Sequence, residues 1–211
     1  MANYFSVFPK ILYSFDNFKS SEYVTNILSR FSFEETLKNN FSAYFLYTIR
    51  DGDTPEILAA KYYDSPNKHW LILMMNNIVD PQFDWPMDST TLDSYIDVKY
   101  MERSESNTAG SGIYWARSNV YAYYITEKQT TTDNIVTVNN YQVDANTYND
   151  TPSLTETITL EDGNSITIET DKFNTSYYEY EVENNDSKRE IKLLRREFLV
   201  PIETELKRVF S

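Results

Sequence analysis

The stretch that decides the fold is YTIRDGDTPEILAAKYYDSPNKHWLILMMNNIVDP, Tyr47 to Pro81. It begins with a strand-like run, and the Asp-Gly-Asp sequence that follows is typical of a turn in which Gly52 takes a positive φ. Thr54 is a natural N-cap for a helix that begins at Pro55, since proline is favoured in the first helical turn. A second helix, apolar on nearly all sides and therefore predicted to be buried, follows in KHWLILMMNNI.

The residues before this stretch predict an N-terminal helical or extended arm over residues 1–46. In SSEYVTNILSRF, from Ser20 to Phe31, apolar side chains recur at helical spacing, and Ser20 or Ser21 is a candidate cap. In SFEETLKNNFSAYF, Ser32 precedes Glu35 by three residues, which is the pattern of a capping box. We therefore expect a helical N-terminal segment.

The residues after the stretch change in character toward β structure. VDPQFDWPMD is an exit marked by prolines, TLDSYIDVKYME predicts a strand or a short helix, and RSESNTAGSG predicts a loop. VYAYYITEK, NIVTVNNYQV and the pair SLTETITL and SITIET alternate apolar and polar residues. Asp162-Gly163 predicts a two-residue hairpin within that pair. Residues 103–176 are thus predicted to form an inserted, exposed β-rich subdomain with a thin core.

The C-terminal residues 177–211 predict a β-hairpin and a helix. YYEYEVE and REIKLL alternate on either side of NNDSK, which is the pattern of a hairpin. PIETELKRVF then puts Ile202, Leu206 and Val209 on one stripe of a helix that starts at Pro201. With residues 47–102 as one further unit, the whole pattern predicts an α+β fold.

The composition narrows the possible functions. The 211 residues carry a formal net charge of -13, which disfavours nucleic acid and anionic membranes as partners. Lys188–Arg208 is locally basic, which fits either a solvated helix face or a terminus that docks on an acidic neighbour. The eighteen tyrosines suit surfaces that a complex covers. The start of the chain lacks the regions of a standard secretory signal, so we expect a protein that stays in a cytoplasm or in something assembled there.

No pattern of residues predicts catalysis. The chain has no cysteine, which excludes thiolate nucleophiles and Cys-based zinc sites, and it has one histidine, His69. His69 lacks the partners of a catalytic or metal-binding histidine and is better interpreted as a structural residue at the start of a helix. No phosphate loop or dinucleotide fingerprint is present in the sequence. We therefore expect a protein that is not an enzyme and needs no metal or cofactor.

The deciding stretch resembles the start of a LysM domain, whose pattern is a strand, a Gly-Asp-Thr turn, a helix, a tyrosine and a second helix. The residues that carry the resemblance are Tyr47, Ile49, Gly52, Asp53, Thr54, Ile57, Ala60, Tyr62, Leu71 and Asn76. The resemblance implies a βααβ unit with a groove for N-acetylglucosamine polymers. Its walls would be Gly52, Asp53 and Thr54 on one side and Asn77, Ile78, Val79 and Asp80 on the other. The structural core would include Ile57, Ala60, Tyr62, Trp70, Leu71 and Trp85, with Trp70 between the two helices.

The sequence departs from a LysM domain where that domain closes with a Gly-containing turn and a strand. That place holds DPQFDWPMDSTTLDSYI, with Trp85-Pro86 and no glycine. This variant, with HWLILMMNNIVDPQFDWPM, TNILSRF and the terminal NNDSKREIKLL, resembles the small baseplate wedge subunit of T4-like contractile-tailed phages. The resemblance covers about the first hundred and the last thirty-five residues, and not the β-rich insertion.

The second resemblance implies a structural subunit of a phage tail baseplate in the virion. It would be assembled in the host cytoplasm and would join wedges into a ring around the hub. Its partners would be other wedge proteins and the sheath-initiating protein, in a sixfold, multi-copy assembly. The predicted groove would then be a protein interface. The alternative is a peptidoglycan-binding or N-acetylglucosamine-binding LysM module of a cell-wall device, which we favour less.

Overall fold

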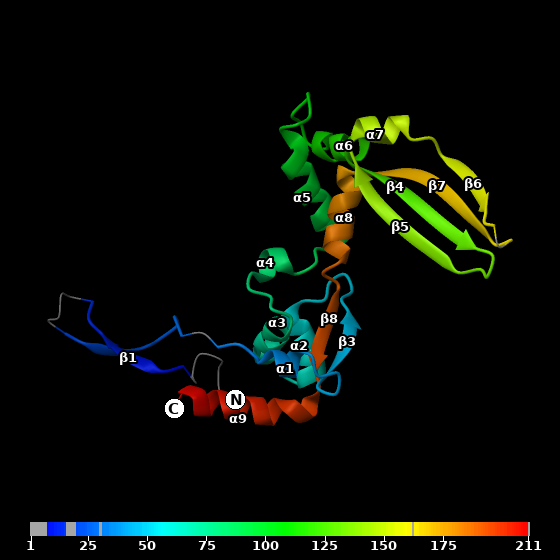
Figure 1. The fold of residues 1–211 in the computed structure, drawn as a ribbon. Helices are drawn as coiled ribbons and strands as arrows, with labels where there is room; N and C mark the ends of the chain where they lie inside the picture. The colour runs from blue at the N-terminus through cyan, green and yellow to red at the C-terminus, as the bar shows by residue number, and fades with distance from the viewer. Residues whose placement is uncertain (1–7, 16–19, 30, 162, 211) are drawn as a thin grey trace. The chain divides into compact units, whose positions relative to one another are not determined.

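The computed structural model of the chain has an α+β fold (Figure 1). The structure describes residues 8–15, 20–29, 31–161 and 163–210. The chain divides into two compact units. Unit 1 is formed by Met1–Asp88 together with Asp186–Ser211, and unit 2 is formed by Ser89–Asn185. Unit 2 is therefore an insertion in the sequence of unit 1.

The N-terminal part of unit 1 is mostly not helical. Strands β1 (Lys10–Tyr13) and β2 (Glu22–Thr25) form an antiparallel two-stranded sheet. The prediction of a helix from Ser20 to Phe31 is thus wrong, because the run of aromatic and β-branched residues within it favours an extended chain. Of the second predicted helix only one turn forms, as α1 (Glu35–Lys38), and no side chain caps it.

The central part of unit 1 runs from strand β3 (Tyr44–Thr48) through helix α2 (Pro55–Tyr63), a 3₁₀ turn η2 (Pro66–Lys68) and helix α3 (His69–Met75). The predicted start of α2 is confirmed. Gly52 has φ +88°, the Thr54 hydroxyl accepts a hydrogen bond from the Ile57 N–H at 3.3 Å, and Pro55 is the first helical residue.

The strand that pairs with β3 comes from far along the chain. It is β8 (Glu190–Leu194), which runs antiparallel to β3 with Tyr44 opposite Leu194 and Thr48 opposite Glu190. The predicted C-terminal hairpin is therefore wrong. Its first half is a helix, α8 (Tyr177–Asp186), and only its second half is a strand. In α8 the buried residues Glu181 and Asn185 are four apart, which places them on one helix face.

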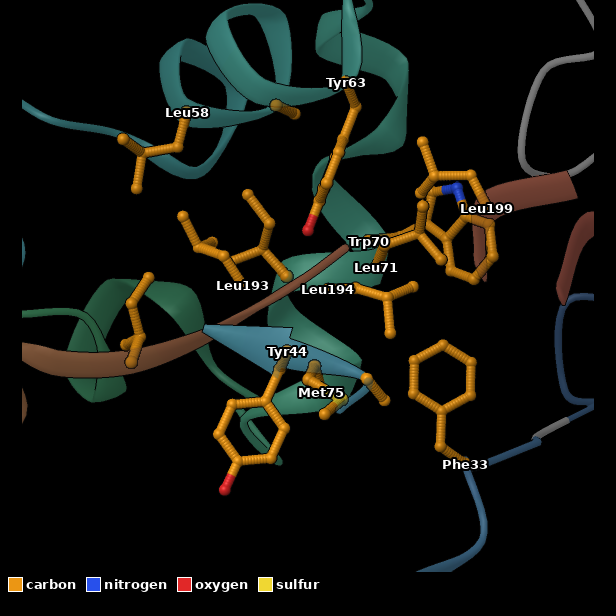
Figure 2. Close-up of a cluster of buried hydrophobic side chains, with 14 of the residues drawn as sticks. Phe33, Tyr44, Leu58, Tyr63, Trp70, Leu71, Met75, Leu193, Leu194 and Leu199 are labelled. Atoms are coloured by element: carbon orange, nitrogen blue, oxygen red, sulfur yellow. The ribbon is translucent and has the colours of Figure 1, made fainter. Parts of the chain in front are cut away.

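Two short helical elements and a longer helix complete unit 1. α4 (Pro81–Asp84) follows α3, and η3 (Arg196–Phe198) leads into α9 (Leu199–Phe210), which begins two residues before the predicted Pro201. The core gathers side chains from α2, α3, β3, β8 and α9 and from the segment before α1 (Figure 2). Its labelled members are Phe33, Tyr44, Leu58, Tyr63, Trp70, Leu71, Met75, Leu193, Leu194 and Leu199.

Unit 2 combines helices with a four-stranded antiparallel sheet. Its helices, besides α8, are α5 (Ser89–Met101), α6 (Ser111–Ser118) and α7 (Ala145–Asp150). Its strands are β4 (Val120–Thr131), β5 (Val136–Val143), β6 (Leu154–Thr159) and β7 (Ser165–Ser176), in the order β5-β4-β7-β6.

The four predicted strands of the insertion are confirmed, with one difference in the turn between β6 and β7. Gly163 has φ +86°, and Asp162, the other residue of the predicted pair, lies outside the described residues. The backbone N–H of Leu160 donates to the Asn164 carbonyl at 2.7 Å, so three residues rather than two lie between this closing pair. Strand β6 is exposed along its full length, as expected for a thin core.

Candidate interaction site

The turn between β3 and α2, which forms one wall of the predicted groove, is held by its own side chains. The Asp53 carboxylate accepts hydrogen bonds from the Tyr47 hydroxyl at 2.7 Å and from the Arg50 N–H at 3.0 Å. Partial burial and the nearby Asp53 carboxylate raise the pKa of Tyr47 to about 12. One carboxylate oxygen of Asp53 thus accepts both hydrogen bonds and holds the conformation of the turn.

Trp85 closes this turn from the other side. Its indole Nε1–H donates a hydrogen bond to the Asp53 carbonyl at 2.9 Å, and its side chain is buried. The cavity that remains beside the turn has a volume of about 230 Å³. Its lining includes Gly52, Asp53 and Thr54 together with Trp85-Pro86. The indole therefore contacts the turn directly and forms part of the wall of this cavity.

Arg189 ties three segments together at the same cavity. Its guanidinium forms ion pairs with Asp51 at 2.9 Å and with Asp186 at 2.7 Å. It also donates to the carbonyls of Ile49 and Met87, each at 3.3 Å. Because Met87 precedes unit 2 in sequence and Asp186 follows it, one side chain holds both ends of unit 1 at the insertion point.

The other predicted wall, Asn77 to Asp80, does not line this cavity. Asn77 and Ile78 line a separate cavity of about 360 Å³ with Asp84, Ser187 and Lys188. The Asn77 amide oxygen accepts from the buried Lys38 ammonium at 2.6 Å. Val79 is exposed, and the Asp80 carboxylate caps α4 by accepting from the Gln82 N–H at 3.0 Å. The two predicted walls thus border two different hollows.

The predicted core residues divide between the inside and the surface. Trp70, Leu71 and Trp85 are buried, and Tyr62 is half-buried. Ile57 and Ala60 are exposed, so they are not core residues. The aromatic neighbours of Trp70 are Phe31 and Phe33, at ring-centroid distances of 5.9 and 6.5 Å, so its ring packs against the segment before α1.

Asn76 is a structural residue that links α3 to β8. Its amide oxygen accepts from the Lys192 N–H at 2.7 Å, and its Nδ2 donates to the Lys192 carbonyl at 2.9 Å. Nδ2 also donates to the Ile72 carbonyl at 2.8 Å. The side chain therefore pairs with β8 as a neighbouring strand would. The resemblance to LysM pointed to Asn76, but no sequence signal identifies a partner 116 residues away.

The β1–β2 hairpin with its flanking residues, which we call the arm (residues 8–15 and 20–28), carries a group of exposed apolar side chains. Leu12 is 60% exposed, Tyr23 is 74% exposed and Leu28 is 84% exposed. The complete group is Ile11, Leu12, Tyr13, Phe15, Tyr23, Ile27 and Leu28. The sequence did not reveal this surface, because Ile27 and Leu28 fit one face of a helix and the residues around Ile11 showed no clear period.

A second apolar feature of unit 1, which we call the apolar groove, lies between the segment around α1 and helix α9. It has a volume of about 460 Å³. Its apolar lining residues are Phe31, Phe33, Leu37, Ile202, Leu206 and Val209, and its polar ones are Ser32, Glu34 and Glu205. The stripe of Ile202, Leu206 and Val209 that the sequence predicts on α9 is thus the groove's wall.

The remaining candidate for chemistry is the single histidine of the sequence, His69. His69 begins α3, and its Nδ1 lies 3.0 Å from the Pro66 carbonyl oxygen. Among the described residues, no group of three or more His, Cys, Asp or Glu side chains is arranged to hold a metal ion. Within the same part of the chain, none of the helices is long and apolar enough to cross a membrane.

Comparison with known proteins gives one family match. A family model described as "Base plate wedge protein 53" matches residues 3–208, which is nearly the whole sequence and includes both units. No curated protein matches the chain.

Proposed function

The chain belongs to the base plate wedge protein 53 family and is a structural protein of a phage tail baseplate; from this premise we propose that it joins neighbouring wedge proteins into the ring around the hub. The partners that we propose are other wedge proteins and the sheath-initiating protein, in a sixfold assembly formed in the host cytoplasm. The family match itself confirms the predicted resemblance to a phage baseplate wedge protein.

The observation that carries the proposal is the exposed apolar surface of the arm. An isolated two-stranded hairpin is only marginally stable in water, and large contiguous apolar surfaces mark sites of association. In the arm, apolar side chains stay exposed on both faces, since the neighbours Leu12 and Tyr13 point to opposite sides of a strand. Such a hairpin gains most of its stability when a partner protein covers it.

We further propose that β3, α2, α3 and β8 form a LysM-like unit that serves as a scaffold for protein contacts. The order of a strand, two helices and an antiparallel strand supports this interpretation. Trp85 and Arg189 narrow the space next to Gly52–Thr54 to a cavity of about 230 Å³, and the second predicted wall borders a different cavity. These contacts favour a protein joint over a glycan groove.

Assembly in vitro tests the proposal. Wedge proteins of the same phage would be co-expressed with the chain or with the variant Leu12→Asp/Tyr23→Asp, and rings would be counted by negative-stain electron microscopy. We expect the variant to fold and to leave wedges as separate particles. Val98→Asp, at a 71% exposed position of α5 in unit 2, is the matched control and should still give rings.

A second assay addresses the glycan alternative. The purified chain would be sedimented with insoluble peptidoglycan and compared with bovine serum albumin. We expect both proteins to stay in the supernatant. Micromolar binding that Gly52→Trp removes would favour the LysM module of a cell-wall device.

In the assembly assay, normal rings with the variant Leu12→Asp/Tyr23→Asp would overturn the joining role of the arm.

A further inference from the structure

The apolar groove is an acceptor surface built from two distant parts of the sequence. Phe31, Phe33 and Leu37 come from the segment around α1, and Ile202, Leu206 and Val209 come from α9. Leu206 is buried, whereas Val209 is 59% exposed, so one end of the groove's wall is open to solvent. A groove of this composition takes an apolar segment rather than a charged or sugar ligand.

The arm has the matching properties. β1 reads Lys-Ile-Leu-Tyr, and its side chains at Ile11, Leu12 and Tyr13 are all exposed. Because successive side chains of a strand point to opposite faces, Leu12 and its partner Tyr23 lie on one face while Ile11 and Tyr13 lie on the other. One face of the hairpin can therefore enter a groove while the other face stays outside, next to the rim of the groove.

We infer that the apolar groove of one copy binds the arm of a second copy. This inference rests on the proposed function of the arm as a joint, and it names the surface that the arm meets. One chain carries both halves of the contact, and the halves are different surfaces. The contact is therefore head-to-tail, which is the kind of contact that repeats around a ring when the rotation closes.

Charge complementarity supports a second copy as the occupant. Two copies of a chain with a net charge of -13 repel each other. Their association therefore needs an apolar contact, together with a positive group of one copy next to a negative group of the other. Lys10 is exposed beside the apolar residues of β1, and Glu34 is exposed at the edge of the groove. Glu205, the other acid of the groove, already pairs with Arg208. We therefore assign Lys10 of one copy to Glu34 of the next.

Cysteine cross-linking tests the contact directly, because the chain has no cysteine of its own and each variant carries only the thiol that is introduced. The variants Leu12→Cys and Val209→Cys would be mixed under wedge-assembly conditions with a copper–phenanthroline oxidant. We expect a disulfide-linked dimer in the mixture that exceeds the dimer formed by either variant alone. In a mixture of single-cysteine chains such a hetero-dimer can only form between copies. Val98→Cys mixed with Val209→Cys is the control and should give background yield.

Charge reversal gives a second readout that misfolding cannot imitate. We expect Lys10→Glu to lower the yield of the cross-link severalfold, and Glu34→Lys in the other copy to restore it. The double-cysteine chain Leu12→Cys/Val209→Cys should form a ladder of linked copies. A disulfide only within that single chain would overturn the inference, because the occupant would then be the chain's own arm.

The outcomes separate this inference from the proposed function. If Leu12→Asp/Tyr23→Asp abolishes rings but the mixed single-cysteine variants give no cross-link above background, the arm is a joint whose partner is another wedge protein, and the inference is overturned. If neither experiment shows an effect of the arm, both are overturned. Cross-linking that tracks ring formation supports both.

Discussion

At the scale of single residues, Asn76 makes the most specific contact in unit 1. Its amide pairs with the backbone N–H and C=O of Lys192 in β8 and with the Ile72 carbonyl in the last turn of α3. We expect Asn76→Ala to lower the free energy of unfolding of unit 1 by about 3 kcal/mol, because it leaves partly buried backbone groups without partners. Urea denaturation, together with hydrogen exchange of peptides from β3 and β8, measures this loss.

The control for Asn76 is Gln82→Ala, an exposed position of α4, which should change the stability by less than about 0.5 kcal/mol. Asn76→Asp keeps an acceptor for the Lys192 N–H but loses the donor Nδ2. Its loss of stability should therefore lie between those of Asn76→Ala and Gln82→Ala. An Asn76→Ala variant as stable as Gln82→Ala would contradict the role of this side chain as a substitute strand.

Residue-level prediction from sequence succeeds where the cause is local. Gly52 and Thr54 could be assigned because a positive φ and an N-cap depend on the next few residues. The contact between the Trp85 indole and the Asp53 carbonyl spans 32 residues and leaves no periodic signal. For the same reason the sequence predicted two facing walls of one groove, whereas Trp85 lies against the turn and Asn77 belongs to another cavity.

At the scale of elements, the contact between α5 and α6 depends on the lack of a side chain at Gly112. A Cβ at this position would lie 2.0 Å from the Asp97 carbonyl oxygen and 2.7 Å from the Met101 nitrogen. We expect Gly112→Ala to destabilise unit 2 by about 3 kcal/mol or more, because backbone must move to make room. Hydrogen exchange of peptides from α5 and α6 under denaturant measures the effect.

Gly110, two residues earlier, is the matched control. It has φ +85°, and a Cβ there would meet no atom within 4 Å. Gly110→Ala should therefore cost only the left-handed strain of about 1–2 kcal/mol. Equal losses for the two alanine variants would mean that backbone conformation, rather than the close approach of α5, decides the stability of this corner.

The start of α6 also makes the stability of unit 2 depend on pH. The Asp97 carboxylate accepts from the N–H groups of Gly110, Gly112 and Ile113 at 2.8, 2.9 and 3.1 Å. These hydrogen bonds, that of Gly110 foremost, lower the pKa of Asp97 in the folded state. A lowered folded pKa stabilises the fold at pH values above the unfolded pKa of about 4, and this contribution is lost as the pH falls through the folded pKa.

Asp97→Asn tests this dependence, since asparagine keeps an acceptor but cannot titrate. We expect the variant to melt at a lower temperature than the parent at pH 7, and the difference to shrink as the pH falls below about 4. Asp144 and Glu179 in the same unit also have lowered pKa values, so the parent itself loses stability in acid. A melting difference that stays constant from pH 7 to pH 3 would contradict the role of the Asp97 charge.

Elements with a clear period or a turn signal could be predicted, and those whose pattern fits two structures could not. The strands of unit 2 and helix α9 show alternation or a stripe, and the structure contains them. The sequence of α8 alternates tyrosine with acidic residues, which also fits a strand. In unit 2 the segment is a helix, and its buried Glu181 accepts from the Tyr100 hydroxyl at 2.6 Å and from the Lys99 ammonium at 2.7 Å. Those partners lie 81 and 82 residues away.

At the scale of the whole molecule, the chain builds unit 1 from two separated parts of its sequence. β3 and β8 pair although unit 2 lies between them in sequence. The sequence revealed an insertion but not its consequence for the sheet, because the REIKLL strand was predicted to pair with YYEYEVE in a hairpin rather than with β3. Side-chain contacts also link the two parts: the Asn76 amide bonds the backbone of Lys192, and Asp51 pairs with the Arg189 guanidinium.

This arrangement predicts that unit 1 folds without unit 2. Arg189 donates to the Met87 carbonyl at 3.3 Å and pairs with Asp186 at 2.7 Å, so both cut ends lie at one guanidinium. A flexible linker of about six residues, with a root-mean-square span of about 13 Å, should therefore replace residues 89–185 without strain. We expect the shortened protein to unfold cooperatively on heating, and Asn76→Ala to destabilise it by about the same 3 kcal/mol as in the full chain.

The matched control for this excision removes seven more residues. Replacing 82–185 with the same linker also deletes Trp85, and with it the buried indole and its hydrogen bond to the Asp53 carbonyl. That protein should lack a cooperative transition, because an aromatic core truncation alone costs about 3–5 kcal/mol. If both shortened proteins failed to unfold cooperatively, the fold of unit 1 would require unit 2, and the insertion would be a folding partner of unit 1 rather than an addition to it.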